Sequence, residues 1–389
     1  MIFGRHEYSP ALSNAERMET GFMRATVFLA TSAIVLIMGL AAFVHTREVS
    51  SPPAVQLVAT NSAAADRSAR RAQRAAATTA LLPEETSTNE LSATNLYVRF
   101  TKGDIPRVSR EQLEPYLAQH HRSVDALLGA LRASGDDALL KEAKERFPDD
   151  PRVQFAAAFK SESAEERQAW LEKFKQSDPD NSLGSYLLAG EHFKAGQTGQ
   201  ALQELATAAG KAGFNNHLLD FIQNTEEAYQ AAGYSEAEAK GVACNSALLP
   251  ELLPFKQVGQ ALVELAKRYE QAGDAASAQA VRDMGLNLGR RLEQPPQVTL
   301  IHELVGRAIE RMVLGSMNRN TPYGATGQTV QNQMDALAVR RKQDSALFAQ
   351  AEPLLNTMSD QDLTHYYDRL KIYGEVSALR WVINQAPQP

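Results

Sequence analysis

An uncharged apolar run over residues 25–44 constrains this chain more than any other feature of its sequence. As an α-helix, this run of twenty residues rises about 30 Å, the thickness of the hydrocarbon core of a bilayer. A helix also satisfies its own backbone hydrogen bonds, as a segment surrounded by lipid must. The run therefore predicts a single transmembrane helix. A cleaved secretory signal and a buried core helix are the alternatives.

The basic residues beside this run predict its orientation. Arg5, Arg17 and Arg24 precede it, whereas only Arg47 follows within a similar distance. Basic flanks stay on the cytoplasmic side, so residues 1–24 are expected to form a cytoplasmic tail. The remainder is then extracytoplasmic, which places it in the periplasm if the span lies in a bacterial inner membrane. The opposite topology, with a cytoplasmic domain, is the alternative.

Residues 45–95 read as a disordered linker, because they are rich in Ala, Ser and Thr and poor in aromatic residues. Such a composition buries too little apolar surface to offset the entropy of ordering. Four arginines within it follow helical spacing, so they would share one face of a helix: Arg67, Arg70, Arg71 and Arg74. A solvated face is the simpler interpretation, and contact with anionic lipid or cell-wall polymer is the alternative.

Beyond the linker, helix signals recur to the end of the chain. Ser109 with Gln112 forms a capping box, and Asp136 and Ser359 also stand where helices should begin. Pro115 is expected to divide or kink its helix. The one strand-like stretch is 96–100 (LYVRF). We therefore predict an all-α protein with a repeat domain over residues 96–293 and a C-terminal helical subdomain over residues 294–389.

Three segments share a pattern of small and large residues around a glycine. The best copy comprises Leu188-Ala189, Phe193, Gly196, Ala201, Leu205 and Ala208. A second copy comprises Leu265-Ala266, Tyr269, Gly273 and Ala278, and a weaker one between them comprises Tyr229, Gly233 and Ala237. This pattern resembles the tetratricopeptide repeat, a pair of antiparallel helices joined at a glycine turn. The resemblance implies a right-handed solenoid, or superhelix, of stacked helical hairpins.

In tetratricopeptide proteins, the first helix of each pair lines a groove that holds a segment of a partner protein. The resemblance therefore implies six partner-binding candidates, counted from the turn glycines: Tyr186, Phe193, Lys194, Val263, Lys267 and Glu270. Ordinary packing between repeats is the alternative for Tyr186 and Phe193.

The sequence contains no recognisable catalytic, metal or cofactor motif. His302-Glu303 begins like the zinc-protease helix, but Gly306 stands where the second histidine is required. The formal net charge of −6 disfavours nucleic acid as a partner, and a single cysteine, Cys244, excludes an internal disulfide. We expect no enzyme activity, no metal, no cofactor and no small-molecule substrate.

Together these features predict a membrane-anchored scaffold that binds another protein of the cell envelope. One alternative is a cell-wall polymer-binding module or an enzyme that uses the long loop at residues 315–328, a length that is often functional. The simpler interpretation of that loop is a mobile connection. A cytoplasm-facing assembly adaptor is the other alternative.

Overall fold

The computed structural model describes residues 95–247, 249–294, 299–324 and 327–385. Within them the chain forms sixteen helices and no strand, so the predicted all-α class is confirmed. The predicted tail, transmembrane span and nearly all of the predicted linker lie outside the described residues. Among the helices that are described, none has the length and apolar character needed to cross a membrane.

The helices follow one another through a single compact unit, Asn95–Pro389. In chain order they are α4 (Leu96–Thr101), α5 (Arg110–Gln119), α6 (Val124–Ser134), α7 (Asp137–Arg146), α8 (Pro151–Lys160), α9 (Ala164–Ser177), α10 (Leu183–Lys194), α11 (Thr198–Ala209), α12 (Leu218–Ala231), α13 (Glu236–Asn245), α14 (Leu252–Gln271), α15 (Ala275–Leu292), α16 (Leu300–Leu314), α17 (Val330–Leu355), α18 (Asp360–Tyr373) and α19 (Glu375–Gln385).

The predicted helix starts are confirmed where a polar side chain caps the first turn. Ser109 accepts a hydrogen bond from the backbone N–H of Gln112, whose side chain in turn accepts from the Ser109 N–H. Asp136 caps α7 and Ser359 caps α18 in the same local way. Each cap satisfies backbone donors that the helix leaves free.

The strand-like stretch 96–100 is helical, in line with the predicted all-α class, and Pro115 does not divide its helix. The strand-like stretch 96–100 is helix α4, capped by the Asn95 side chain, and its buried residues pack against α13. Pro115 lies inside an unbroken α5. The chain breaks instead after His120, where His121 and Arg122 adopt left-handed φ angles of 53° and 51°.

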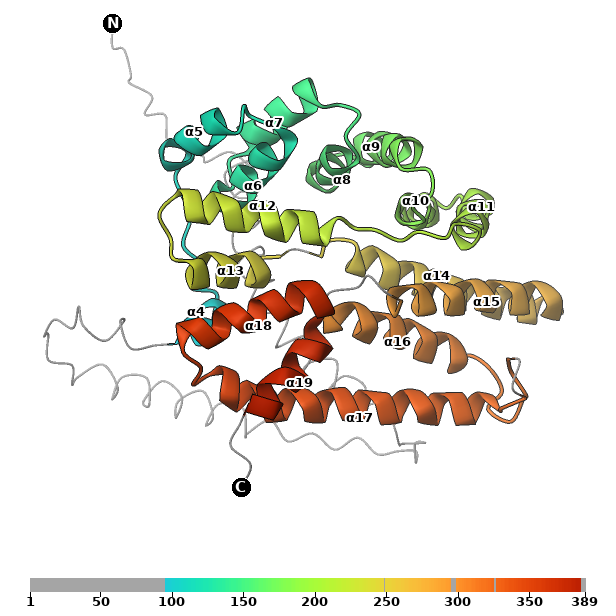
Figure 1. Cartoon of the computed structure of the whole chain (residues 1–389). Helices are drawn as coiled ribbons and strands as arrows, with labels where there is room; N and C mark the ends of the chain where they lie inside the picture. The colour runs from blue at the N-terminus through green and yellow to red at the C-terminus, as the bar shows by residue number, and fades with distance from the viewer. Residues whose placement is uncertain (1–94, 248, 295–298, 325–326, 386–389) are drawn as a thin grey trace, which may run out of the picture. The chain divides into compact units, whose positions relative to one another are not determined.

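The two better repeat copies pack directly on each other (Figure 1). Helix α10 contacts α14, and α11 contacts α15. The Tyr186 ring meets the edge of Phe255 with centroids 6.1 Å apart, and Gly190 lies against Val258. These contacts make the first helices of the two hairpins direct neighbours.

The weaker copy, α12–α13, does not lie between them. Helix α12 packs against α6, while α13 packs against α4 and α18, as Figure 1 shows. The approach of α12 is very close at Gly129, where a Cβ atom would lie 2.2 Å from the carbonyl oxygen of Asn224. The helical hairpins therefore pair with neighbours, but not in simple chain order.

A second close crossing joins α15 to α16, where Gly289 and Gly306 meet backbone to backbone. This contact explains the residue that interrupts the zinc-protease pattern, since position 306 has no room for a side chain. Helix α16 also packs on α14, and α17 packs on α16 and α19. The helices on both sides of residue 294 thus share one core.

Candidate functional site

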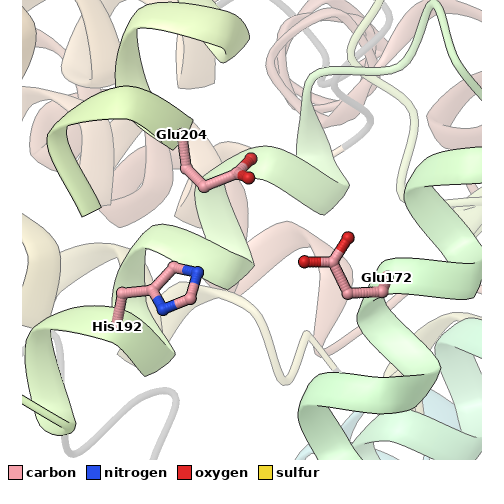
Figure 2. A group of neighbouring side chains, drawn as sticks. All are labelled: Glu172, His192 and Glu204. Carbon is pink, nitrogen blue, oxygen red and sulfur yellow. The ribbon is translucent and has the colours of Figure 1, made fainter. Parts of the chain in front are cut away.

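Three metal-ligating side chains meet where α9, α10 and α11 pack together (Figure 2). Glu172, His192 and Glu204 each place one ligand atom within 4.8 Å of the other two. The imidazole of His192 is buried, with 6% of its residue surface exposed. The sequence analysis missed this group because the three residues come from three helices and follow no ligand motif.

Lys175 lies between the two carboxylates of this group. Its Nζ is 2.8 Å from Glu204 Oε1 and 3.1 Å from Glu172 Oε2. Burial lowers the pKa of Lys175, but its bonds to Glu204 and Glu172 outweigh that effect and the net shift is upward. The second oxygen of Glu204, Oε2, is buried without a hydrogen-bond partner.

The predicted partner-binding residues fall into two groups. Tyr186 and Val263 are buried, with 2% and 7% of their surfaces exposed, so they are core residues rather than part of an open groove wall. Phe193 is half-buried against the same core. For Tyr186, the alternative of packing between repeats matches its contact with Phe255.

The other three candidates are exposed near the C-terminal ends of α10 and α14. Each forms an ion pair within the chain: Lys194 with Glu191 at 2.8 Å, Lys267 with Glu264 at 2.8 Å, and Glu270 with Arg282 at 2.6 Å. The Lys267–Glu264 pair is exposed on both sides and contributes little to stability, so Lys267 can exchange its acidic neighbour for a partner at small cost. Glu191, by contrast, is buried and also pairs with Arg167 at 3.3 Å.

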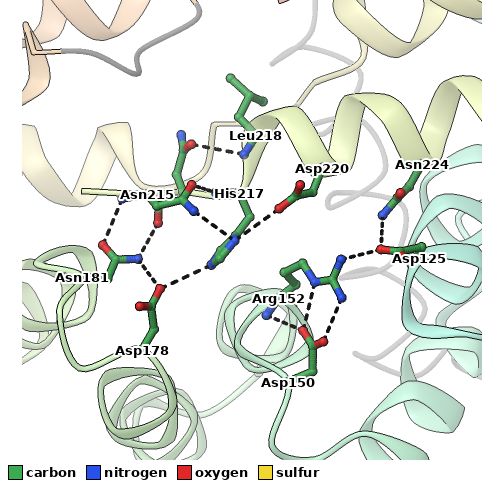
Figure 3. Close-up of polar contacts among 11 residues, drawn as sticks. Asp125, Asp150, Arg152, Asp178, Asn181, Asn215, His217, Leu218, Asp220 and Asn224 are labelled. Atoms are coloured by element: carbon green, nitrogen blue, oxygen red, sulfur yellow. Dashed lines mark hydrogen bonds and ion pairs between the residues drawn. The ribbon is translucent and has the colours of Figure 1, made fainter. Parts of the chain in front are cut away.

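A polar junction directs the chain from α11 into α12 (Figure 3). The Asn181 side chain donates to the Asn215 carbonyl at 2.7 Å and to Asp178 at 2.9 Å. Its oxygen accepts from the N–H groups of Leu183 at 3.1 Å and Asn215 at 3.0 Å. One buried amide thus fixes both the start of α10 and the segment before α12.

His217 occupies the tightest point of this junction, with a left-handed φ of 55°. Its N–H donates to the Asn215 side chain at 2.8 Å, which holds that backbone geometry. Its ring faces Asp220 through Nδ1, at 3.4 Å, and the hydrogen bond from His217 lowers the pKa of Asp220. No nucleophile joins the pair within the network that Figure 3 draws.

Arg152 extends the junction toward α6 and α12. It binds Asp150 through two hydrogen bonds of 2.9 and 3.1 Å and also bonds Asp125. Asp125 in turn accepts from Asn224 at 3.1 Å. Burial raises the pKa of Asp150, but the bonds from Arg152 outweigh this and the net shift is downward. These hydrogen bonds and ion pairs join α6, α8 and α12, so the role of the network is structural.

Hydrogen bonds hold the described residues of the loop between α16 and α17 at several points. The Tyr323 N–H donates to the Gln328 carbonyl at 2.8 Å, and the Tyr323 hydroxyl donates to Asp283 on α15. The N–H of Val330 donates to the Thr321 carbonyl at 3.0 Å. These bonds fold the described part of the loop back onto itself and onto α15, and they bring no catalytic pair together there.

No protein-family model matches the chain, and no curated protein or solved structure is significantly similar to it. The relation to tetratricopeptide repeats therefore stays a resemblance. It rests on the residue pattern and on the packing of α10–α11 against α14–α15.

Proposed function

We propose that this chain is a membrane-anchored, non-catalytic scaffold that uses a tetratricopeptide-like surface to bind another protein of the cell envelope. The observation that supports it most is the direct packing of α10 on α14. Neighbouring first helices of this kind form the binding wall of repeat proteins. The apolar run at residues 25–44 supports the anchor, and its basic flank supports an extracytoplasmic domain.

Within that wall, the surface that we assign to the partner lies at the C-terminal ends of α10 and α14. Lys194, Lys267 and Glu270 are exposed there, and half-buried Phe193 adds apolar area next to Lys194. The charges of both signs and the neighbouring aromatic ring fit a peptide segment that carries acidic and apolar side chains. Tyr186 and Val263 would support this surface from beneath.

Site-specific photo-crosslinking in living cells tests the proposal. A photoreactive amino acid replaces Lys194 or Lys267 in the full-length protein, and a matched control replaces Lys141, which is exposed on α7. We expect one partner protein of the same mass to be captured from positions 194 and 267 but not from position 141. Absence of any product at 194 and 267, or the same product from all three positions, would refute this surface.

Protease accessibility tests the orientation separately. We expect residues 95–389 to be digested once the outer barrier is opened while the inner membrane stays intact. Protection until the inner membrane is lysed would overturn the extracytoplasmic assignment, and the partner would then be sought in the cytoplasm.

A further inference from the structure

We propose that Glu172, His192 and Glu204 form a binding site for a divalent first-row transition-metal cation, with Lys175 as the occupant that the cation displaces. This inference is independent of the proposed scaffold function. It rests on the chemistry of three donors from α9, α10 and α11 and on the way their neighbours orient them (Figure 2).

His192 is oriented as a ligand. Its Nδ1 lies 2.8 Å from Gln197 Oε1, and because an amide oxygen can only accept, Nδ1 must carry the proton. In the neutral imidazole this leaves the lone pair on Nε2, and Figure 2 shows the ring turned toward both carboxylates. A histidine that donates through its other ring nitrogen is the usual arrangement of a metal ligand.

The two carboxylates already hold a cation. The Lys175 ammonium bridges Glu204 and Glu172 at 2.8 and 3.1 Å, yet it leaves Glu204 Oε2 buried and without a partner. An ammonium group can donate to an imidazole lone pair, but the ion pairs of Lys175 at this group are with the two carboxylates. A metal ion would accept electron pairs from the imidazole and from both carboxylates at once. The buried and unpartnered Glu204 Oε2 is therefore explained better by a metal than by the lysine.

The backbone that carries these donors is closely packed. Helix α10 contacts both α9 and α11, and at Gly184 a Cβ atom would lie only 3.1 Å from the Cβ of Lys175. The helices therefore cannot drift apart without losing this contact. Ligand atoms around a tetrahedral zinc ion lie about 3.4 Å from one another, so small side-chain rotations would bring donors now within 4.8 Å into coordinating positions.

The donor set favours zinc and its neighbours in the first transition row. Imidazole suits zinc, copper, iron and nickel, whereas magnesium and calcium prefer oxygen ligands alone. Three protein ligands leave at least one coordination position for water. We therefore choose Zn²⁺ as the primary probe and Co²⁺ as a spectroscopic probe.

Calorimetric titration of the full-length protein in detergent with Zn²⁺ tests the site through Lys175. Lys175→Gln removes the competing charge, so we expect it to tighten Zn²⁺ binding by about tenfold or more. The matched control is Lys173→Gln, an exposed lysine two residues away on the same helix, which should leave the affinity unchanged. Equal affinity in both variants and the wild type would overturn the proposal.

His192→Gln and Glu204→Gln test the ligands directly. We expect each to weaken Zn²⁺ binding by about 100-fold and to abolish the visible absorption bands of bound Co²⁺, while circular dichroism shows that the helices are retained. His120→Gln with His121→Gln is the control for adventitious histidine sites and should change neither measurement. Zn²⁺ binding that survives in Lys175→Gln combined with His192→Gln, or that is absent from Lys175→Gln itself, would refute the site.

Discussion

Replacement of Gly306 by alanine should destabilise the protein, because it forces α15 and α16 apart. A Cβ atom at position 306 would lie 2.5 Å from the Gly289 carbonyl oxygen and 3.1 Å from the Leu292 Cβ. The first distance is shorter than any ordinary contact of a Cβ atom, and the obstacle is backbone, which cannot rotate away. Relief therefore requires movement of the whole helix pair.

Two opposing effects set the magnitude. Overpacking of a tight core costs about 1–3 kcal/mol, and separation of the helices would also loosen the contact between Gly285 and Val313 on the same crossing. Alanine is favoured over glycine inside a helix by about 1 kcal/mol. The clash is the larger effect here, so we expect a net loss of about 1–2 kcal/mol.

Urea unfolding followed by far-ultraviolet circular dichroism measures this loss. With a slope of about 3 kcal/mol per molar urea, the midpoint should fall by about 0.5 M. Gly199→Ala on α11 is the matched control, because nothing lies within 4 Å of its added methyl group, and its midpoint should stay the same or rise slightly. A Gly306→Ala protein as stable as the wild type would refute the assignment of a backbone-to-backbone crossing.

Three further predictions concern other parts of the structure. Asn181→Ala removes the buried amide of the polar junction and leaves the N–H groups of Leu183 and Asn215 without partners. It should therefore lower the free energy of unfolding by about 2–3 kcal/mol in the same urea assay, and no measurable loss would contradict the role given to this amide. Burial and the neighbouring Glu293 carboxyl raise the pKa of Glu310 to about 8. Because this folded value exceeds the unfolded one, the contribution of protonated Glu310 to stability should be full below about pH 4.5 and decline as the pH rises toward 8. Glu310→Gln should flatten that decline, whereas the control Glu165→Gln, at an exposed glutamate on α9, should not. An unchanged dependence of stability on pH in Glu310→Gln would exclude Glu310 as the cause of the decline. Tyr323→Phe removes the hydrogen bond from the Tyr323 hydroxyl to Asp283, so it should speed proteolytic cleavage within residues 315–328. An unchanged cleavage rate would show that this hydrogen bond does not hold the loop in place.

The sequence by itself determined most of the helices in the described residues. Ser109, Asp136 and Ser359 mark helix starts. Capping and apolar periodicity act within one or two turns, so they can be read from neighbouring residues alone. At residues 96–100 the short alternation resembles a strand when it is considered alone, and the Asn95 cap and the packing against α13 go with the helix that the all-α prediction requires.

Tertiary structure decided which hairpins became neighbours. Nothing local in α12 indicates that it returns to α6, because that packing depends on the absence of a side chain at Gly129 and on the junction around Asn181 and His217. The contact of α10 with α14 likewise buries Tyr186, a groove candidate by spacing, against Phe255.

The group formed by Glu172, His192 and Glu204 has the same origin. Its members are separated by many residues and lie on three helices, and no spacing rule connects them. They face one another only because α9, α10 and α11 pack at close range. Interactions between neighbouring residues determine where the helices form. The shapes and buried polar groups of distant segments determine which helices pack together.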